Sequence, residues 1–403
     1  MAAPAAPKID LWSSSSFAGG HPREQYRRLR QNDPVHWHEE PDGRGFWAIT
    51  KHEDIRAISR DSKTFSNSPT IMMQDPPPGS GAGLGGNMMI MIDPPSHTRY
   101  RNLVKSGFTP HAIEPRRERI QALAKRIVDE VIERGECDFV TDIAGKLPSY
   151  VIADLVGIPL EDGVMFYDWT EIIHSAPDAV PPEVRAETLQ KMVLYSAQVA
   201  QQKQANPGDD LSTHLLNSEV DGDRLSLPDF ISFFILLMDA GGDTTRNLVG
   251  GGMHLLLEHP DQREQLLADL DGLLPNAVEE MLRYVSPVVY MRRNLTADVE
   301  LRGKKLRAGD KLLMYYGSAN ADEDVFRDGD SFDIRRDCTE HVAFGSGGAH
   351  FCLGANIARM EIIAMFREVL TRMKDIERAG ETQWLASNFI SGPTHLPIRF
   401  RAS

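Results

Sequence analysis

Residues 341–354, HVAFGSGGAHFCLG, combine four glycines with one of only three cysteines in a chain of 403 residues. Glycine lets a backbone turn tightly and approach other groups closely. The residues that follow, CLGANIARMEIIAMFREVLTRM, recur at helical spacing and predict a long helix opening at Cys352. Loop N–H groups and the start of a helix both stabilise a negative sulfur. The stretch therefore predicts a cysteine with a lowered thiol pKa, held as a thiolate.

Other uses of such a loop do not fit its chemistry. A phosphate-binding loop would place Lys and then Ser or Thr after its last glycine, and this one does not. Structural zinc needs four ligands and an iron–sulfur cluster needs four thiolates, and Cys137, Cys338 and Cys352 alone supply neither set. His350 alone does not supply the partners that zinc would need beside Cys352. The three cysteines also form no close pair, which argues against a disulfide framework and favours a reducing compartment. A thiolate bound to iron agrees with the residues best.

Composition points to a soluble enzyme. The chain is 41% hydrophobic and 25% charged, and its net charge of −14 disfavours binding to nucleic acid or to an anionic membrane. The longest apolar run, residues 230–238, is about half the length of a membrane-spanning helix. The Ala-, Pro- and Ser-rich start lacks the features of a secretory signal, and residues 1–20 are expected to form a poorly ordered tail. We expect a cytoplasmic protein without a membrane anchor.

Helical periodicity dominates most of the sequence. Residues 95–134 and 147–206 carry it, and a buried central helix is predicted from Ser226 and Pro228 through Leu257, where His259 and Pro260 stop it. A further helix is predicted over 276–287, past Pro275. A strand and a helix are predicted within 45–61, and strands within 288–295, 299–319 and 394–401. The fold class is mainly α, with small β elements gathered toward the second half.

The central helix contains AGGDTT, residues 240–245. Each glycine inside a helix costs about 1 kcal/mol relative to alanine, so a tertiary reason is expected for Gly241 and Gly242. A flat ligand lying on the helix is one reason, with Asp243 and Thr244 opening the helix ladder locally into a proton path. Tight helix packing over the glycines, with Thr244 bonded to its own backbone, is the other.

Three motifs in order, AGGDTT, ExxR at Glu280–Arg283 and FGSGGAHFCLG, resemble the cytochrome P-450 family of haem-thiolate monooxygenases, over nearly the whole chain. The resemblance implies the fold of that family, mainly α with small β sheets and a long central helix over haem. It also implies a single domain over residues 21–403 and an oxidoreductase that uses haem b (iron protoporphyrin IX). Dioxygen would be the cosubstrate, and one of its atoms would enter an apolar substrate, most simply by hydroxylation.

The same resemblance implies roles for individual residues. Cys352 is the axial ligand of the haem iron, and Asp243 and Thr244 are the acid and alcohol that steer protons during dioxygen activation. Glu280, Arg283 and Arg336 form an ion-pair cluster that braces the cysteine loop. The positive groups implied for the two haem propionates are His97, Arg101, Arg293 and His350. Further residues implied to lie against the haem are Phe344, Gly241 and Gly354. The implied substrate pocket comprises Met88, Met89, Leu237, Ala240, Val288, Val289 and Phe389.

Phe344 and Cys352 are eight positions apart, where many bacterial members have seven. This spacing, with VSPVVYMRR (285–293) and SNFISG (387–392), is similar to a subgroup that hydroxylates sterols and methyl-branched lipids. A terpenoid, steroid or branched lipid is the substrate class that follows. The methionines within residues 72–91 are either an adaptable wall for such a substrate or filling for the core.

Electrons for a monooxygenase come from a nicotinamide cofactor, yet the chain has no dinucleotide-binding fingerprint and no four-cysteine cluster. We therefore expect NAD(P)H to act only through separate proteins, a ferredoxin and its reductase. Basic residues in 97–105 and 115–119 form either their docking face or ordinary solvated helix surfaces. Two alternatives stay open, a peroxide-driven enzyme of the same fold and a haem-based sensor or binding protein.

Overall fold

The structure, a computed structural model, describes residues 8–41, 43–76, 88–175, 180–220 and 223–403. Its α-helices are α1 Arg23–Asn32, α2 His52–Arg60, α3 Ser96–Val104, α4 Pro110–Ile113, α5 Arg117–Asp129, α6 Lys146–Val156, α7 Leu160–His174, α8 Pro182–Ala205, α9 Leu211–Leu216, α10 Leu227–Glu258, α11 Pro260–Ala268, α12 Leu270–Val285, α13 Tyr316–Ala319 and α14 Ala355–Arg372. The main strands are β1 Val35–His38, β2 Phe46–Ile49, β3 Phe65–Ser66, β4 Glu136–Asp138, β7 Tyr290–Leu295, β10 Lys311–Tyr315, β11 Met373–Arg378 and β14 Pro397–Ala402. Short pairs complete the list: β5 Glu219–Val220 with β6 Asp223–Arg224, β8 Val299–Leu301 with β9 Lys304–Leu306, and β12 Gln383–Trp384 with β13 Pro393–His395.

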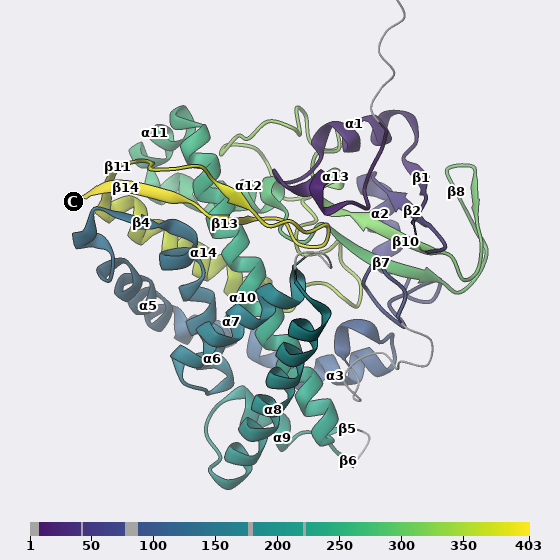
Figure 1. The fold of residues 1–403 in the computed structure, drawn as a ribbon, viewed down its shortest axis with the longest axis horizontal. Helices are drawn as coiled ribbons and strands as arrows, with labels where there is room; N and C mark the ends of the chain where they lie inside the picture. Colours follow the sequence, from purple (N-terminus) through teal and green to yellow (C-terminus); the bar gives the residue numbers. More distant parts are fainter. Residues whose placement is uncertain (1–7, 42, 77–87, 176–179, 221–222) are drawn as a thin grey trace, which may run out of the picture.

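Helix α10 crosses the middle of the molecule, as the sequence predicts (Figure 1). The Ser226 hydroxyl caps it by accepting the N–H of Asp229. Its 32 residues give a rod of about 48 Å. It packs against α6, α7, α8, α12 and α14 and is buried along most of its length. The centre of the fold is thus one long helix enclosed by others.

A five-stranded sheet in the order β1-β2-β10-β7-β3 forms the other part of the molecule, at the right in Figure 1. Strand β10 runs parallel to β2 and antiparallel to β7. The sheet therefore joins strands from the first 66 residues to strands after residue 290. The expectation that β structure gathers toward the second half was wrong for β1, β3 and β4, which are too short to stand out beside the helices. Strand β2 was expected within residues 45–61.

Two predicted helix starts differ from the structure, and one predicted helix end agrees with it. Helix α14 begins at Ala355 rather than at Cys352, because Gly354 occupies its N-cap position. Helix α12 begins at Leu270 and contains Pro275, since Asp269 caps it by accepting the N–H of Gly272. His259 and Pro260 end α10 as predicted, but Pro260 also opens α11, where a proline is tolerated in the first turn.

Part of the N-terminal segment that was expected to be a poorly ordered tail is packed into the fold. Residues 1–7 lie outside the described residues, whereas Leu11 and Phe17 are fully buried in the core against the five-stranded sheet. The Leu11 N–H also donates to His38 Nε2 at 3.0 Å. The predicted tail therefore does not extend to residue 20, because its apolar residues are held by packing that the Ala- and Ser-rich composition conceals. The description of residues 21–403 as one domain stays a prediction.

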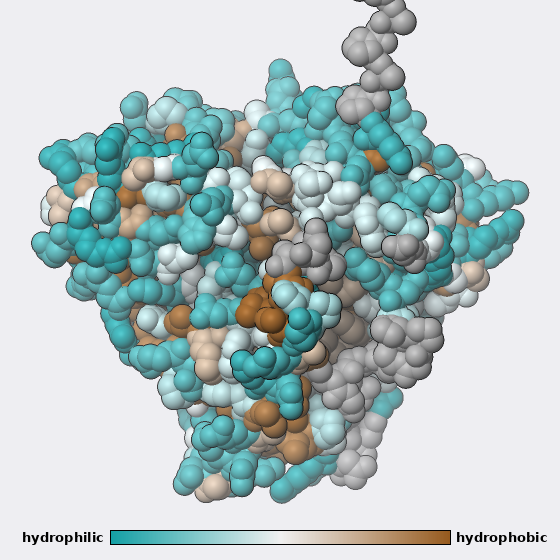
Figure 2. Space-filling model, viewed as in Figure 1, coloured by the Kyte–Doolittle hydropathy of each residue, from teal (hydrophilic) through white to brown (hydrophobic). Residues whose placement is uncertain are grey.

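Figure 2 shows a mostly hydrophilic face, with hydrophobic colour gathered near its middle and lower part, where Figure 1 places α8 and α10. Large exposed apolar side chains on these two helices are Val184, Leu194 and Leu227. Within the described residues no single helix combines the length and apolarity of a membrane span. One neighbouring pair, Val140–Val156 and Leu160–His174, meets both criteria jointly but is bent by 118°.

Candidate functional site

The cysteine loop is a tight backbone structure between α13 and α14. Gly345, Gly347 and Gly348 have φ of 84°, 84° and 78°, a region that glycine adopts without strain. A Cβ on Gly348 would lie 2.2 Å from the carbonyl oxygen of Ser59, so no side chain fits there. The N–H of Cys352 donates to the carbonyl of Phe344 at 2.9 Å and closes the loop. Glycine is thus required both by conformation and by close approach.

Cys352 lies directly before α14, and its sulfur accepts the N–H groups of Gly354 and Ala355. The side chain keeps accessible surface, yet protein surrounds it closely enough to remove it from bulk water. Burial therefore raises the thiol pKa above its ordinary value, and the two N–H groups with Arg101 and Arg359 only oppose that effect. The predicted donors are present, but the predicted lowering of the pKa was wrong because desolvation prevails.

Four groups that can carry positive charge gather from α3, β7 and the cysteine loop. The rings of His97 and His350 lie 4.0 Å apart between centroids. Arg101 donates to the carbonyl of Phe351 at 2.6 Å, and the buried Arg293 donates to the carbonyl of Arg292 at 2.9 Å. Among the described residues, His97 Nδ1 and His350 Nε2 have no hydrogen-bond partner. We call His97, Arg101, Arg293 and His350 the positive cluster.

The electrostatics of the positive cluster fit an anion. Burial, with a smaller contribution from neighbouring positive charges, lowers the pKa of His97 to about 4 and that of His350 to about 2, and Asp93 only partly opposes the effect at His97. No ion pair joins these four residues to an acidic side chain within the described part of the chain. Buried polar groups normally find a partner. Two carboxylates, such as the propionates of haem, would supply acceptors for the unpartnered nitrogens and restore charge balance.

Ala240, Gly241 and Thr244 keep accessible surface on a helix that is otherwise buried. The Thr244 hydroxyl donates to the carbonyl of Ala240 at 3.0 Å, and α10 continues as an α-helix through this point. The predicted opening of the helix ladder was therefore wrong. A Cβ on Gly241 would lie 3.2 Å from Ile152 on α6, so this glycine serves helix packing. The accessible Ala240 and Thr244 are the groups that this turn offers to a ligand.

Asp243 is buried and held from several sides. His174 Nδ1, at the end of α7, lies 3.0 Å from Oδ2, and Asn247 Nδ2 lies 3.2 Å from Oδ1. His174 Nε2 lies 3.2 Å from Asp239 Oδ1, so one imidazole bridges two carboxylates. Although burial lowers the pKa of His174, the two carboxylates prevail and raise it well above its ordinary value. The sequence missed His174 because nothing in its local pattern marks a helix-terminal histidine as a partner of α10.

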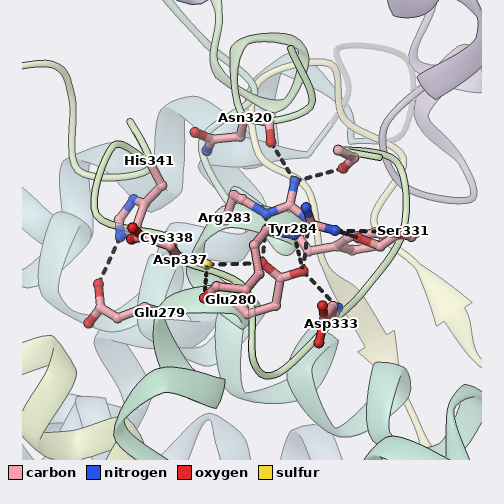
Figure 3. Close-up of polar contacts among 12 residues, drawn as sticks. Glu279, Glu280, Arg283, Tyr284, Asn320, Ser331, Asp333, Asp337, Cys338 and His341 are labelled. Atoms are coloured by element: carbon pink, nitrogen blue, oxygen red, sulfur yellow. Dashed lines mark hydrogen bonds and ion pairs between the residues drawn. The ribbon is translucent and has the colours of Figure 1, made fainter. Parts of the chain in front are cut away.

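Glu280 and Arg283 meet in a fully paired cluster (Figure 3). Arg336 pairs with Glu280 in the same cluster, as expected. Arg283 binds Glu280 through two hydrogen bonds of 2.7 Å, and Arg336 Nε lies 3.3 Å from Glu280 Oε1. Arg283 also donates to the carbonyls of Asn320, Gly329 and Ser331. The Cys338 thiol lies 3.1 Å from Glu280. We call this group the ExxR cluster, and its contacts tie α12 to the segment that leads into the cysteine loop.

The predicted pocket residues do not all have access to a ligand. Met89 and Leu237 lie in the main core cluster with Met88 packed against it, whereas Val289 and Phe389 lie in the cluster under the five-stranded sheet. Val289 has no accessible surface, so its assignment to the pocket was wrong, whereas its neighbour Val288 keeps accessible surface. Phe389 places its ring 5.8 Å from that of His174.

Proteins of known name and known structure are similar to this chain over most of its length. A sequence model of the family described as Cytochrome P450 matches residues 160–375. The chain is 41% identical to a methyl-branched lipid omega-hydroxylase of Mycobacterium tuberculosis, over 88% of this chain and 84% of that one. It is 38% identical to a steroid C26-monooxygenase of Mycolicibacterium smegmatis, over 98% and 97%. A Mycobacterium marinum cytochrome P450 solved in complex with pseudoionone superposes with a TM-score of 0.91 at 36% identity, covering 99% of this chain and all of that one. The chain therefore belongs to the cytochrome P450 family, monooxygenases that use haem b, dioxygen and electrons from redox partners.

Proposed function

We propose that this protein hydroxylates an apolar molecule of the terpenoid, steroid or branched-lipid class, with haem held by Cys352 and the positive cluster. The observation that carries the proposal is the pairing of an accessible cysteine at a helix start with buried positive groups that have unpartnered nitrogens. The names of the relatives, a lipid hydroxylase and a steroid monooxygenase, support the substrate class.

The Cys352 sulfur would be the protein ligand of the iron. Its raised pKa is no obstacle, since a metal ion deprotonates a coordinating thiol outright. His97, Arg101, Arg293 and His350 would bind the propionates. Phe344 and Gly354 would lie beside the ring, because both flank the cysteine in the loop. Bound in this way, the haem supplies dioxygen activation, which the side chains alone do not.

Thr244 and Asp243 would hold and move the protons that the reaction takes up. The Thr244 hydroxyl is accessible on α10, and the Asp243 carboxylate lies one residue before it with its oxygens fixed by His174 and Asn247. In this role, Asp243 would supply protons for the Thr244 hydroxyl to pass on. Glu280, Arg283 and Arg336 would act only by bracing the loop.

The substrate would lie against apolar side chains from the two core clusters, namely Met88, Met89, Leu237, Ala240, Val288 and Phe389. Methionine chains adapt to irregular shapes, which suits a branched or polycyclic hydrocarbon.

A ferredoxin and its reductase are the proposed electron donors. Arg99, Lys105, Arg117 and Arg119, from the basic stretches, have exposed side chains on the segments from α3 to α5. An acidic partner would be attracted to such a surface. We also propose a cytoplasmic location, which agrees with three free cysteines.

The test is spectroscopic. The purified protein should contain haem, and its ferrous carbonyl adduct should show the red-shifted band of a sulfur-ligated iron, which Cys352→His should abolish. A wild-type protein without haem, or without that band, contradicts the proposal. A screen of terpenoids, steroids and branched fatty acids for shifts of the haem absorption band then identifies the substrate class.

Thr244→Ala tests the proton role and separates a monooxygenase from a sensor or a peroxide-driven enzyme. We expect the variant to divert reduced dioxygen into hydrogen peroxide and to lose product several-fold, roughly the loss of one proton-transfer group. The measurement is product and peroxide formed per NAD(P)H consumed. An unchanged product yield contradicts the role of Thr244. The peroxide-driven alternative is favoured if the wild-type enzyme turns over as fast with peroxide alone as with redox partners.

A further inference from the structure

A partly open cavity of about 160 Å³ has no residue of the cysteine loop in its lining. Its lining includes Thr141, Gly145, Tyr167, Asp168, Glu171 and His395, contributed by the π-helix Val140–Ala144, α7 and β13. The cavity thus presents two carboxyl groups and a phenol to solvent. Nothing in the monooxygenase assignment so far explains it.

Arg246 lies behind this cavity and links it to Asp243. The side chain is fully buried, and its guanidinium carbon lies 4.6 Å from the ring centroid of Tyr167. Nη1 is 3.5 Å from Glu171 Oε2 and 3.9 Å from Asp243 Oδ1. Nε and Nη2 have no hydrogen-bond partner among the described residues. One buried arginine therefore stands between a carboxyl group at the cavity and the carboxyl group beside Thr244.

We propose that this cavity is the entrance through which protons from solvent reach Asp243, with Glu171 as the proton carrier and Arg246 as the positioning residue. The inference rests on the proposed role of Asp243. In each passage a proton moves from cavity water to Glu171, from Glu171 to water held on Arg246, and from that water to Asp243. Glu171 then returns to a carboxylate, so that one proton has moved inward and no other bond has changed.

Glu171 has the setting that a proton carrier needs. About a third of its side chain is accessible, at 35%, so it exchanges protons with solvent, while Oε2 accepts the Tyr167 hydroxyl at 3.2 Å. Burial raises the pKa of Glu171, and the negative charges of Asp243 and Asp168 raise it further, against a smaller opposite effect of His395. A raised pKa brings a carboxyl group closer to working pH, where it both takes up and releases a proton.

Arg246 does not carry the proton itself. Burial lowers its pKa to about 9, which leaves the guanidinium charged at neutral pH. Its unpartnered donors are the kind of buried group that ordered water satisfies. Water bound to these donors would lie close to both carboxyl groups, since Glu171 and Asp243 each approach Nη1 of the same guanidinium group.

Other charged groups around this path act differently. His174 is held between Asp239 and Asp243 with its pKa raised, so it retains its proton and positions Asp243. His395 pairs with Asp138 at 2.9 Å. The titratable and charged groups that face Glu171 are thus Tyr167, Asp168 and His174 from α7, Asp243 and Arg246 from α10, Lys146 from α6 and His395 from β13.

The test compares Glu171→Gln, which keeps shape but exchanges no proton, with Glu171→Asp and with Glu187→Gln. Glu187→Gln removes an exposed carboxylate of α8 that does not line the cavity. We expect Glu171→Gln to lower product per NAD(P)H by roughly 10-fold and to raise the solvent deuterium isotope effect on product formation. Glu171→Asp should restore at least half of the loss, and Glu187→Gln should stay within about twofold of wild type.

A second readout does not depend on turnover. Infrared difference spectra of wild type against Glu171→Gln, recorded across a pH titration without substrate, should show one protonated carboxyl band that Glu187→Gln retains. Glu171→Gln with product yield and isotope effect within twofold of wild type overturns the inference, as does the absence of that band. If Glu171→Gln fails to fold, Arg246→Lys replaces it with the same expected loss. The ferrous carbonyl spectrum of the wild-type protein tests the proposed function and does not depend on Glu171. A normal spectrum together with an inactive proton path would therefore contradict this inference alone.

Discussion

The ExxR cluster and the positive cluster are both buried, and they differ in how completely their charges are paired. In the ExxR cluster every guanidinium nitrogen of Arg283 donates to an acceptor, and both carboxylate oxygens of Glu280 accept hydrogen bonds. In the positive cluster two ring nitrogens have no partner among the described residues, and the groups repel one another. The first arrangement is complete without a ligand. The second is complete only when an anion joins it.

The difference separates a structural ion-pair cluster from a binding site. An uncompensated buried charge is costly, and a chain that holds several together without acids commonly does so for function. The histidines of the positive cluster reduce that cost by losing their protons, as their lowered pKa values indicate. Motif recognition alone assigned both clusters, but only the pairing distinguishes what each of them does.

The largest expected effect is on stability. Glu280→Gln should destabilise the protein by about 3–5 kcal/mol, because it leaves Arg283 buried without its counter-charge. Urea unfolding measures the change. Glu340→Gln, which breaks the exposed pair with Arg56, is the control and should cost less than about 1 kcal/mol. Equal effects of the two substitutions would show that the ExxR cluster is not a structural brace.

The next effect should fall on haem binding instead. Arg293→Gln should weaken haem binding by about 10- to 100-fold, the value of one charge-assisted hydrogen bond, and leave the unfolding of the haem-free protein unchanged. Haem transfer to an excess of a haem-binding acceptor protein measures the first quantity, and urea unfolding the second. A large loss of stability with unchanged haem retention would reverse the contrast between the two clusters.

The smallest expected effect is a pH dependence at Glu279, adjacent to the ExxR cluster. Burial raises the pKa of Glu279, but hydrogen bonds from Arg359 and His341 outweigh it and lower the pKa to about 2. Because the folded pKa lies below the ordinary 4.5, the stabilisation is present above pH 4.5 and is lost as pH falls toward 2. Because 28% of the Glu279 side chain is exposed, solvent screens these interactions, and we expect a contribution of about 1–2 kcal/mol to the free energy of unfolding.

Unfolding midpoints measured from pH 6 to pH 3 test this expectation with Glu279→Gln as the comparison. Wild type should lose more stability than the variant over that interval, so that the two curves converge at low pH. Parallel curves would show that Glu279 contributes no acid-sensitive stabilisation.

Much of the fold followed from local patterns. The central helix was predicted to within two residues of α10, since Ser226 caps it and His259 and Pro260 end it by local chemistry. Strand β2 and helix α2 were likewise expected within 45–61. The start of α12 was missed because the cap at Asp269 outweighs Pro275, a competition that residue preferences do not resolve. His174, Arg246 and Glu171 were missed because they meet only when α7 packs against α10.

The sequence by itself determined the order of the helices, the residues of the cysteine loop and the family to which its three motifs belong, because periodicity, capping and glycine conformation act over a few residues. Tertiary structure alone decided that the Cys352 pKa rises rather than falls, that Gly241 serves packing and that Val289 is closed off. It also decided which buried charges are paired. Those outcomes depend on desolvation and on contacts between distant segments, whose energies no local pattern contains.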